Sequence, residues 1–184
     1  PGQVMLAMRA ASLNYRDILM IRGKYNPRQR LPLIVLSDGV GEVVSIGGGV
    51  RGIAVGDRVC PLFCQGYLAG EPTKEKLATT LGGPLDGVLR ERMTLSAESV
   101  VDVPRHLSDA QAATLPCAAL TAWNALVEQG GLTPGQTVLV QGTGGVSMFA
   151  LQIAKAIGAR VIVTSSSAPT LEKARELGAD HGID

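Results

Sequence analysis

The feature that most constrains the fold is an alternation of strands and helices in the last third of the chain. Apolar, strand-like runs at 137–140 and 160–164 alternate with helical stretches at 146–157 and 171–177. A glycine turn, residues 141–147, joins the first strand to the first helix. Strands that alternate with helices of this length form parallel sheets covered by helices. The pattern therefore predicts an α/β fold with a parallel sheet that begins near residue 137.

The first hundred residues have a different, β-rich pattern. Alternating apolar residues at 4–8 and an apolar run at 40–46 predict strands, and a Gly56-Asp57 turn introduces a third strand at 58–62. A short helix is expected at 15–22, with Asn14 as its cap and Gly23 at its end. Glycines and prolines interrupt residues 64–86, which predicts a long surface loop.

The character of the chain changes near Pro104. Ser108 and Gln111 form a capping-box pattern that opens an Ala-rich helix, and Pro116 interrupts this helix before a second one at 117–128. We therefore expect two domains, a β-rich one at 1–107 and an α/β one at 108–184.

Composition excludes several classes of protein. The 184 residues are 46% hydrophobic and carry a net charge of +1, so neither nucleic acid nor a membrane is expected as a partner. The most apolar stretch, 146–163, is interrupted by Lys155 and Arg160, which argues against a membrane span. Three cysteines without a disulfide pattern favour a reducing, cytoplasmic location.

The glycine turn predicts a dinucleotide site. Gly142 and Gly144 can make the tight turn and let the backbone approach a pyrophosphate, which the unpaired N–H groups of the following helix then bind. Ser147 replaces the third glycine of the usual motif, a small change that is expected to loosen the packing of helix on strand slightly. The expected cofactor-binding residues of the turn are Gly142, Thr143, Gly144, Gly145, Val146 and Ser147. The alternative is a structural turn without a ligand.

The end of the second strand favours NADP(H) over NAD(H). NAD sites place an acid about 20 residues after the glycines to bind the ribose hydroxyls. Here no acid lies between Gly142 and Glu172, and the strand ends in hydroxyl residues that tolerate a 2′-phosphate. These expected cofactor-binding residues are Thr164, Ser165, Ser166 and Ser167. Lys173 and Arg175 could add positive charge, although their helical spacing is more typical of a solvated face.

Five segments together resemble one family across nearly the whole chain. They are 11–17 (ASLNYRD), 39–44 (GVGEVV), 55–59 (VGDRV), 115–123 (LPCAALTAW) and the glycine turn. The chain resembles the medium-chain dehydrogenase/reductase superfamily, in its zinc-free quinone-oxidoreductase-like branch, whose members are often called zinc-type alcohol dehydrogenase-like. The resemblance implies a GroES-like catalytic domain at 1–107, followed at 108–184 by the first half of a Rossmann domain. In NADP-using relatives a lysine often stands at the position of Thr170.

The resemblance also implies that no zinc binds. The three catalytic ligand positions of the zinc-dependent branch correspond to Asn14, Ser37 and Cys117, of which only the last is a ligand type. The structural zinc of that branch needs four close cysteines, where this chain has Cys60 and Cys64. Cys117 is then expected to be a small buried residue, with a redox role as the alternative.

Without a metal, other groups must stabilise the charge that develops on the acceptor oxygen. In similar zinc-free enzymes the segment of Asn14 and Tyr15 faces the nicotinamide and substrate, and the position of Thr121 contacts the nicotinamide. Tyr15 has the only acidic proton among them, so Tyr15 and Asn14 are the expected catalytic residues. The alternative makes Asn14 a helix cap, Tyr15 a packed aromatic residue and Asp17 a structural first-turn acid.

These observations predict an NADPH-dependent, metal-free oxidoreductase that transfers a hydride to a quinone, enone or other activated carbonyl compound. A metal-free alcohol or aldehyde dehydrogenase and a non-catalytic NADPH-binding relative are the alternatives. A small-molecule substrate and a homo-oligomeric full-length protein are expected. Because six strands complete a Rossmann sheet, the chain is expected to be part of a longer protein and to be inactive by itself.

Overall fold

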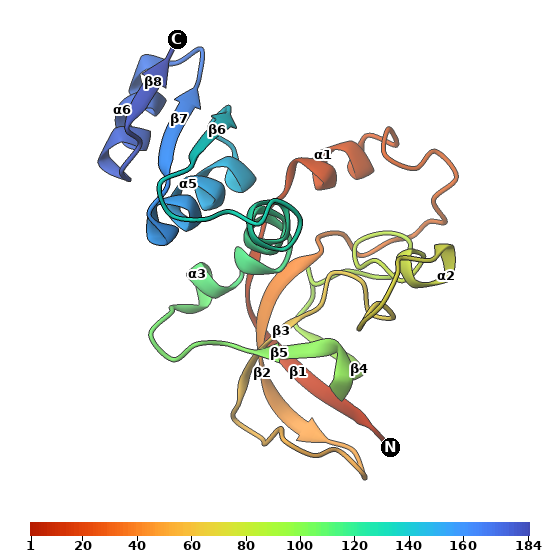
Figure 1. Ribbon diagram of the computed structural model, residues 1–184. Helices are drawn as coiled ribbons and strands as arrows, with labels where there is room; N and C mark the ends of the chain where they lie inside the picture. Colours follow the sequence, from red (N-terminus) through yellow and green to blue (C-terminus); the bar gives the residue numbers. More distant parts are fainter. The chain divides into compact units, whose positions relative to one another are not determined.

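The computed structural model describes residues 1–184 and contains two compact units, Pro1–Cys117 and Ala118–Asp184. The first unit is built on an antiparallel five-stranded sheet with strand order β4-β1-β2-β3-β5 (Figure 1). Its strands are β1 (Gln3–Ser12), β2 (Asp38–Ile46), β3 (Arg58–Pro61), β4 (Arg92–Ser96) and β5 (Val100–Asp102). The predicted strands at 4–8, 40–46 and 58–62 are confirmed, whereas β4 and β5 were not anticipated.

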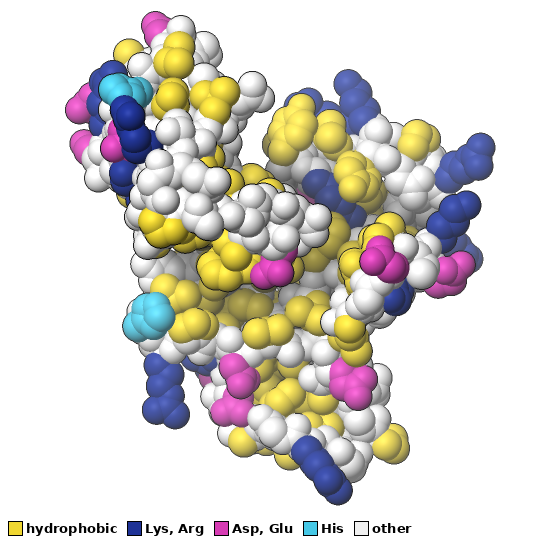
Figure 2. Space-filling view, viewed as in Figure 1, with side chains coloured by type: hydrophobic (Ala, Val, Ile, Leu, Met, Phe, Trp, Pro, Cys, Tyr) yellow, Lys and Arg dark blue, Asp and Glu magenta, His cyan; other side chains and the backbone are white.

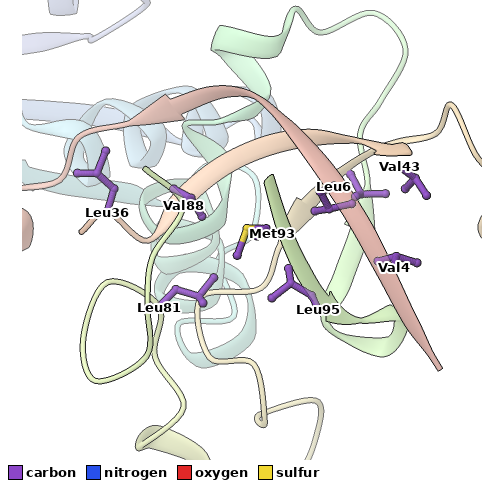
Figure 3. Close-up of a cluster of buried hydrophobic side chains, with 9 residues drawn as sticks. Val4, Leu6, Leu36, Val43, Leu81, Val88, Met93 and Leu95 are labelled. Atoms are coloured by element: carbon purple, nitrogen blue, oxygen red, sulfur yellow. The ribbon is translucent and has the colours of Figure 1, made fainter. Parts of the chain in front are cut away.

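The main core of the first unit lies between this sheet and the loops that cover it. Figure 3 shows Val4 and Leu6 of β1 beside Val43 of β2 and Met93 of β4, with side chains from the 81–88 segment completing the cluster. Val4, Leu6 and Val43 are fully buried. Burying such side chains stabilises a fold by roughly 1.5–3 kcal/mol each, so β1 and β2 form a rigid base for the segments that follow them.

Helix α1 (Tyr15–Ile21) follows β1 directly. Asn14 occupies the N-cap position as predicted, and its backbone N–H donates to the Asp17 carboxylate at 2.7 Å. The helix ends before Gly23, whose positive φ of 65° suits glycine and whose N–H donates to the carbonyl of Met20. The local sequence therefore determines both ends of α1.

The prediction of a surface loop at 64–86 is only partly right. The segment contains a short helix, α2 (Lys74–Leu77), and it returns to the core at Leu81, which is 2% exposed. Arg16 of α1 holds this return: its guanidinium donates to the carbonyl oxygens of Leu81 and Gly83. The loop is thus tied to α1 by hydrogen bonds that composition alone does not reveal.

The predicted capping box at Ser108 is confirmed and begins α3 (Asp109–Ala112). Because α3 packs on β1 and β2, it belongs to the first compact unit, which extends to Cys117. A short 3₁₀ turn, η1 (Ala97–Ser99), precedes β5. A second helical stretch starts at Leu115. It comprises η2 (Leu115–Ala119), α4 (Leu120–Trp123) and η3 (Asn124–Gln129), of which η2 and η3 are π-helical turns.

The second unit contains a parallel sheet of order β6-β7-β8 and the helices α5 and α6 (Figure 1). The bounds are β6 (Thr137–Gln141), α5 (Gly145–Ile157), β7 (Arg160–Thr164), α6 (Ala168–Glu176) and β8 (His181–Ile183). The predicted alternation is confirmed, although α6 begins earlier than residue 171. Leu151 of α5 and Leu171 of α6 are buried with Val163 of β7. No helix in the structure is long and apolar enough to cross a bilayer.

Candidate functional site

The glycine turn lies between β6 and α5, at the carboxyl end of a parallel strand, as the sequence predicted. Gly142 has a positive φ of 76°, and its N–H donates to the carbonyl oxygen of Thr164 at 2.9 Å. The Ser147 hydroxyl donates to the carbonyl oxygen of Gln141 at 2.9 Å, which ties the first turn of α5 to the end of β6. Ser147 therefore fastens the helix to the strand, where a slight loosening was expected.

The geometry of this turn fits a dinucleotide pyrophosphate. A Cβ atom built on Gly142 or Gly144 would meet no heavy atom within 4 Å, so packing within the protein does not require glycine at Gly144. No side chain caps α5 at its N-cap, Gly144, and the first N–H groups of a helix have no acceptor within it. Open space above uncapped N–H groups suits a phosphate anion. Gly145 and Val146, the first two residues of α5, contribute such N–H groups.

The hydroxyl residues after β7 differ in how the protein uses them. Thr164 Oγ1 accepts from the N–H of Gly142, and Ser165 Oγ forms a 2.7 Å hydrogen bond with Thr170 Oγ1. Ser166 is exposed, and Ser167 is the N-cap of α6 without a side-chain capping bond. The structure therefore leaves Ser166 and Ser167 as the hydroxyls that are available to a ligand here. Lys173 is exposed, and Arg175 forms an ion pair with Glu172.

Two other predicted residues of the second unit lie near this turn. Thr143 is part of the turn itself, and Thr121 is exposed on α4, which packs against α5. A Cβ atom built on Gly145 would lie 3.5 Å from the side chain of Ala118, so the helical stretch passes close to the start of α5. Thr121 is thus on the same unit as the glycine turn, as a nicotinamide contact would require.

Asn14 and Tyr15 belong to the first unit and have opposite environments. Tyr15 is 74% exposed at the first position of α1, so the alternative that it is a packed aromatic residue is wrong. Figure 2 shows apolar side chains gathered over α1, where Leu13, Ile18 and Ile21 are also exposed. The amide nitrogen of Asn14 is instead buried and has no hydrogen-bond partner. In this rotamer Asn14 cannot donate to a substrate from that nitrogen.

Sequence reasoning missed a second buried carboxylate beside Asn14. Asp38 is 1% exposed at the start of β2; its Oδ1 accepts from the Ser37 hydroxyl at 2.7 Å and its Oδ2 accepts from the Cys117 backbone N–H at 2.9 Å. Burial raises the pKa of Asp38, opposed by the Ser37 hydroxyl, the Asn14 side chain and the Cys117 N–H, while the charge of Asp17 raises it further. An acid inside an otherwise apolar run was the available signal.

The residues at the three zinc-ligand positions do not fit a catalytic zinc. Asn14 and Ser37 replace two ligands, and no group of three or more His, Cys, Asp or Glu residues could hold a metal ion. Catalytic zinc takes three protein ligands. Cys117 is half-buried, where a buried residue was expected, and its backbone N–H donates to Asp38 Oδ2 at 2.9 Å.

Two family models match the chain: the alcohol dehydrogenase GroES-like domain over residues 1–105, and the zinc-binding dehydrogenase family over residues 145–184. The chain belongs to the medium-chain dehydrogenase/reductase superfamily. As in other members, a GroES-like domain precedes a Rossmann-like parallel sheet, here its first part. Neither family model covers the residues between 105 and 145, so the matches do not test the expected domain boundary after Leu107, which stays a prediction.

Several named members of the superfamily are similar to this chain over its whole length. A zinc-type alcohol dehydrogenase-like protein of Schizosaccharomyces pombe is 47% identical over 100% of this chain and 54% of its own length. A Sinorhizobium meliloti 1021 structure, titled provisionally as an alcohol dehydrogenase, has a TM-score of 0.91 and 48% identity over 99% of this chain and 54% of its own. The quinone oxidoreductase of Coxiella burnetii has a TM-score of 0.78 and 29% identity over 100% of this chain and 53% of its own. The chain therefore spans about half the length of these superfamily members.

Proposed function

We propose that the protein containing this chain is an NADPH-dependent oxidoreductase that works without a metal ion and transfers a hydride to a quinone, enone or other activated carbonyl compound. The observation that carries the proposal is the open, uncapped turn at Gly142–Ser147. A pyrophosphate can approach its backbone without displacing any side chain. The similarity to a protein titled quinone oxidoreductase supports the choice of substrate class.

In this proposal the chain contributes residues both to cofactor binding and to the reaction. The α5 N-terminus binds the pyrophosphate. The hydroxyls of Ser166, which is exposed, and Ser167 donate to the 2′-phosphate, without the repulsion that an acid would cause. NADPH, when bound, supplies the hydride. The exposed Tyr15 hydroxyl donates a proton or a hydrogen bond to the acceptor oxygen. Thr121 contacts the nicotinamide, and Asn14 caps α1.

The test is an assay of the full-length protein with NADPH and matched substrates. We expect the absorbance of NADPH at its reduced-nicotinamide band to fall in the presence of a benzoquinone or an enone, after exhaustive treatment with a chelator. Tight NADPH binding without turnover of any substrate would favour the non-catalytic alternative. Loss of activity on chelation, restored by zinc, would contradict a metal-free reaction.

An acid at Ser166 should change the cofactor preference. The carboxylate of Ser166→Asp would repel the 2′-phosphate dianion and could accept from ribose hydroxyls. We expect the KM for NADPH to rise about tenfold or more, about 1.4 kcal/mol, while the KM for NADH stays the same or falls. Ser166→Asn, which has the same shape without the charge, is the matched control. Equal effects of both variants on both cofactors would contradict the proposed phosphate site.

Removing the Tyr15 hydroxyl should slow the chemical step. Tyr15→Phe keeps the ring of an exposed residue, so the fold and the affinity for NADPH should not change. Loss of a general acid reduces kcat by about 100-fold or more, with little change in the KM for the substrate. A wild-type kcat in Tyr15→Phe would show that another group donates the proton.

An alcohol or aldehyde dehydrogenase is the second candidate, because the names of the S. pombe and S. meliloti relatives refer to alcohol dehydrogenase. The two functions differ in the substrate that is turned over: primary or secondary alcohols with the oxidised cofactor, or quinones and enones with the reduced one. Steady-state rates with both sets, measured on one preparation without metal, distinguish them.

A further inference from the structure

Two buried carboxylates lie beside the segment that carries Tyr15, and neither has a basic partner. Asp17 and Asp38 are 2% and 1% exposed, and the ion pairs of the structure involve other residues. Burying an unpaired carboxylate is unfavourable unless hydrogen bonds compensate for lost water. The hydrogen bonds that the two carboxylates accept are therefore what compensates for their burial.

The hydrogen bond from Cys117 to Asp38 joins two segments that are remote in sequence, whereas the bond that Asp17 accepts is local. Asp38 joins its own β2 to the backbone of Cys117, which is 79 positions away, while Asp17 accepts from the N–H of Asn14. The Asn14 side chain lowers the pKa of Asp38, although its nitrogen has no hydrogen-bond partner. We call these residues, with Ser37, the Asp38 cluster: Asn14, Asp17, Ser37, Asp38 and Cys117.

The backbone before the cluster is held in an unusual conformation. Leu36 has a positive φ of 70°, in a region that residues with a side chain rarely adopt, and it is nevertheless buried. The N–H of Val88 donates to the Leu36 carbonyl at 2.9 Å and helps to hold it there. The surrounding structure therefore determines where Ser37 and Asp38 lie, which is the condition for a strained residue to persist.

The geometry points to a role for Asp38 in catalysis that acts through Tyr15. We propose that Asp38 is a positioning residue: its hydrogen bonds hold the 37–38 and 117 segments together, and its backbone pairs with Ser12 at the end of β1, two residues before Asn14, so that the start of α1 presents Tyr15 in one fixed direction. Tyr15 is itself exposed, so its position depends on the backbone that the Asp38 cluster anchors. The inference rests on the proposed function of Tyr15.

The donor and acceptor pattern of the cluster suggests which variants to compare. In Asp38→Asn, the amide oxygen can still accept from the Cys117 N–H. The amide nitrogen can donate to the Ser37 hydroxyl, because a hydroxyl can accept a hydrogen bond as well as donate one. In Asp38→Ala both bonds are lost. We expect kcat to fall about 10- to 100-fold in Asp38→Ala, because small misplacements of a reacting group have effects of this size, and to stay within about threefold of wild type in Asp38→Asn.

A double-mutant cycle in the full-length protein separates positioning from a general structural role. If Asp38 acts through Tyr15, Asp38→Ala should lower kcat by less than about threefold in a Tyr15→Phe background. The matched control is Asp57→Ala, which removes another carboxylate of the first unit that accepts a backbone N–H, that of Ala54. We expect Asp57→Ala to lower the melting temperature without changing kcat. Equal losses of kcat from Asp38→Ala in both backgrounds would overturn the proposal.

Amide hydrogen exchange tests the same anchoring without any turnover. The Cys117 N–H should exchange slowly in wild type and in Asp38→Asn, and at least about tenfold faster in Asp38→Ala. Fast exchange of this amide in wild type would overturn the proposal. If Tyr15→Phe leaves kcat unchanged while the Cys117 amide is protected as expected, the proposed role of Tyr15 fails, and with it the positioning role that acts through Tyr15.

Discussion

Replacement of Gly144 by aspartate should abolish NADPH binding without destabilising the protein. A side chain at Gly144 has open space, and its φ of −76° is accessible to any residue. Aspartate is a better N-cap than glycine by a few tenths of a kcal/mol and suits the helix dipole. Its carboxylate would occupy the N–H groups of α5 and repel the pyrophosphate. We expect a dissociation constant for NADPH at least about 100-fold higher, about 2.7 kcal/mol, with an unchanged or slightly higher melting temperature.

The matched control for this prediction is Gly144→Asn. Asparagine caps a helix about as well as aspartate and has the same shape, but it carries no charge. A smaller loss of affinity in Gly144→Asn would measure the contribution of charge repulsion, and the remaining loss would measure occupation of the site. Titration calorimetry with NADPH gives both constants. Wild-type affinity in Gly144→Asp would show that the pyrophosphate does not bind at this turn.

Replacement of Gly87 by alanine, in contrast to replacement of Gly144, should strongly destabilise the first unit. A Cβ atom on Gly87 would overlap the carbonyl oxygens of Leu36 and Val35. Both are backbone atoms, so the 34–36 segment would have to move away from the core. Overpacking of this severity destabilises by about 3 kcal/mol or more. We expect a fall in melting temperature of more than about 10 °C, measured by circular dichroism.

Gly48→Ala is the control for Gly87→Ala. Gly48 is exposed, and a Cβ atom there would meet nothing within 4 Å. We expect its free energy of unfolding to stay within about 0.5 kcal/mol of wild type. Similar stabilities for the two variants would mean that the 34–36 segment can relax without loss of packing. Gly87 and Gly144 thus separate a glycine that the fold needs from one that the proposed ligand needs.

Local patterns explain which elements the sequence predicted correctly. The caps at Asn14 and Ser108 act on the helix that immediately follows them, and the glycine turn acts between adjacent elements. The alternation of strands and helices after residue 137 predicted the parallel sheet for the same reason. Strand β4 could also have been predicted, because apolar Met93 and Leu95 alternate with polar residues in the sequence, and the structure buries both.

The sequence by itself determined the parallel sheet, the helix caps and the glycine turn, since each depends on residues a few positions apart. Only the tertiary structure decided that Asp38 is buried against the Cys117 backbone, that Tyr15 is exposed, and that Gly87 lies against Leu36. These contacts join segments that are far apart in the chain. Their geometry depends on how the sheet and its covering loops pack, and no local pattern of residue types records it.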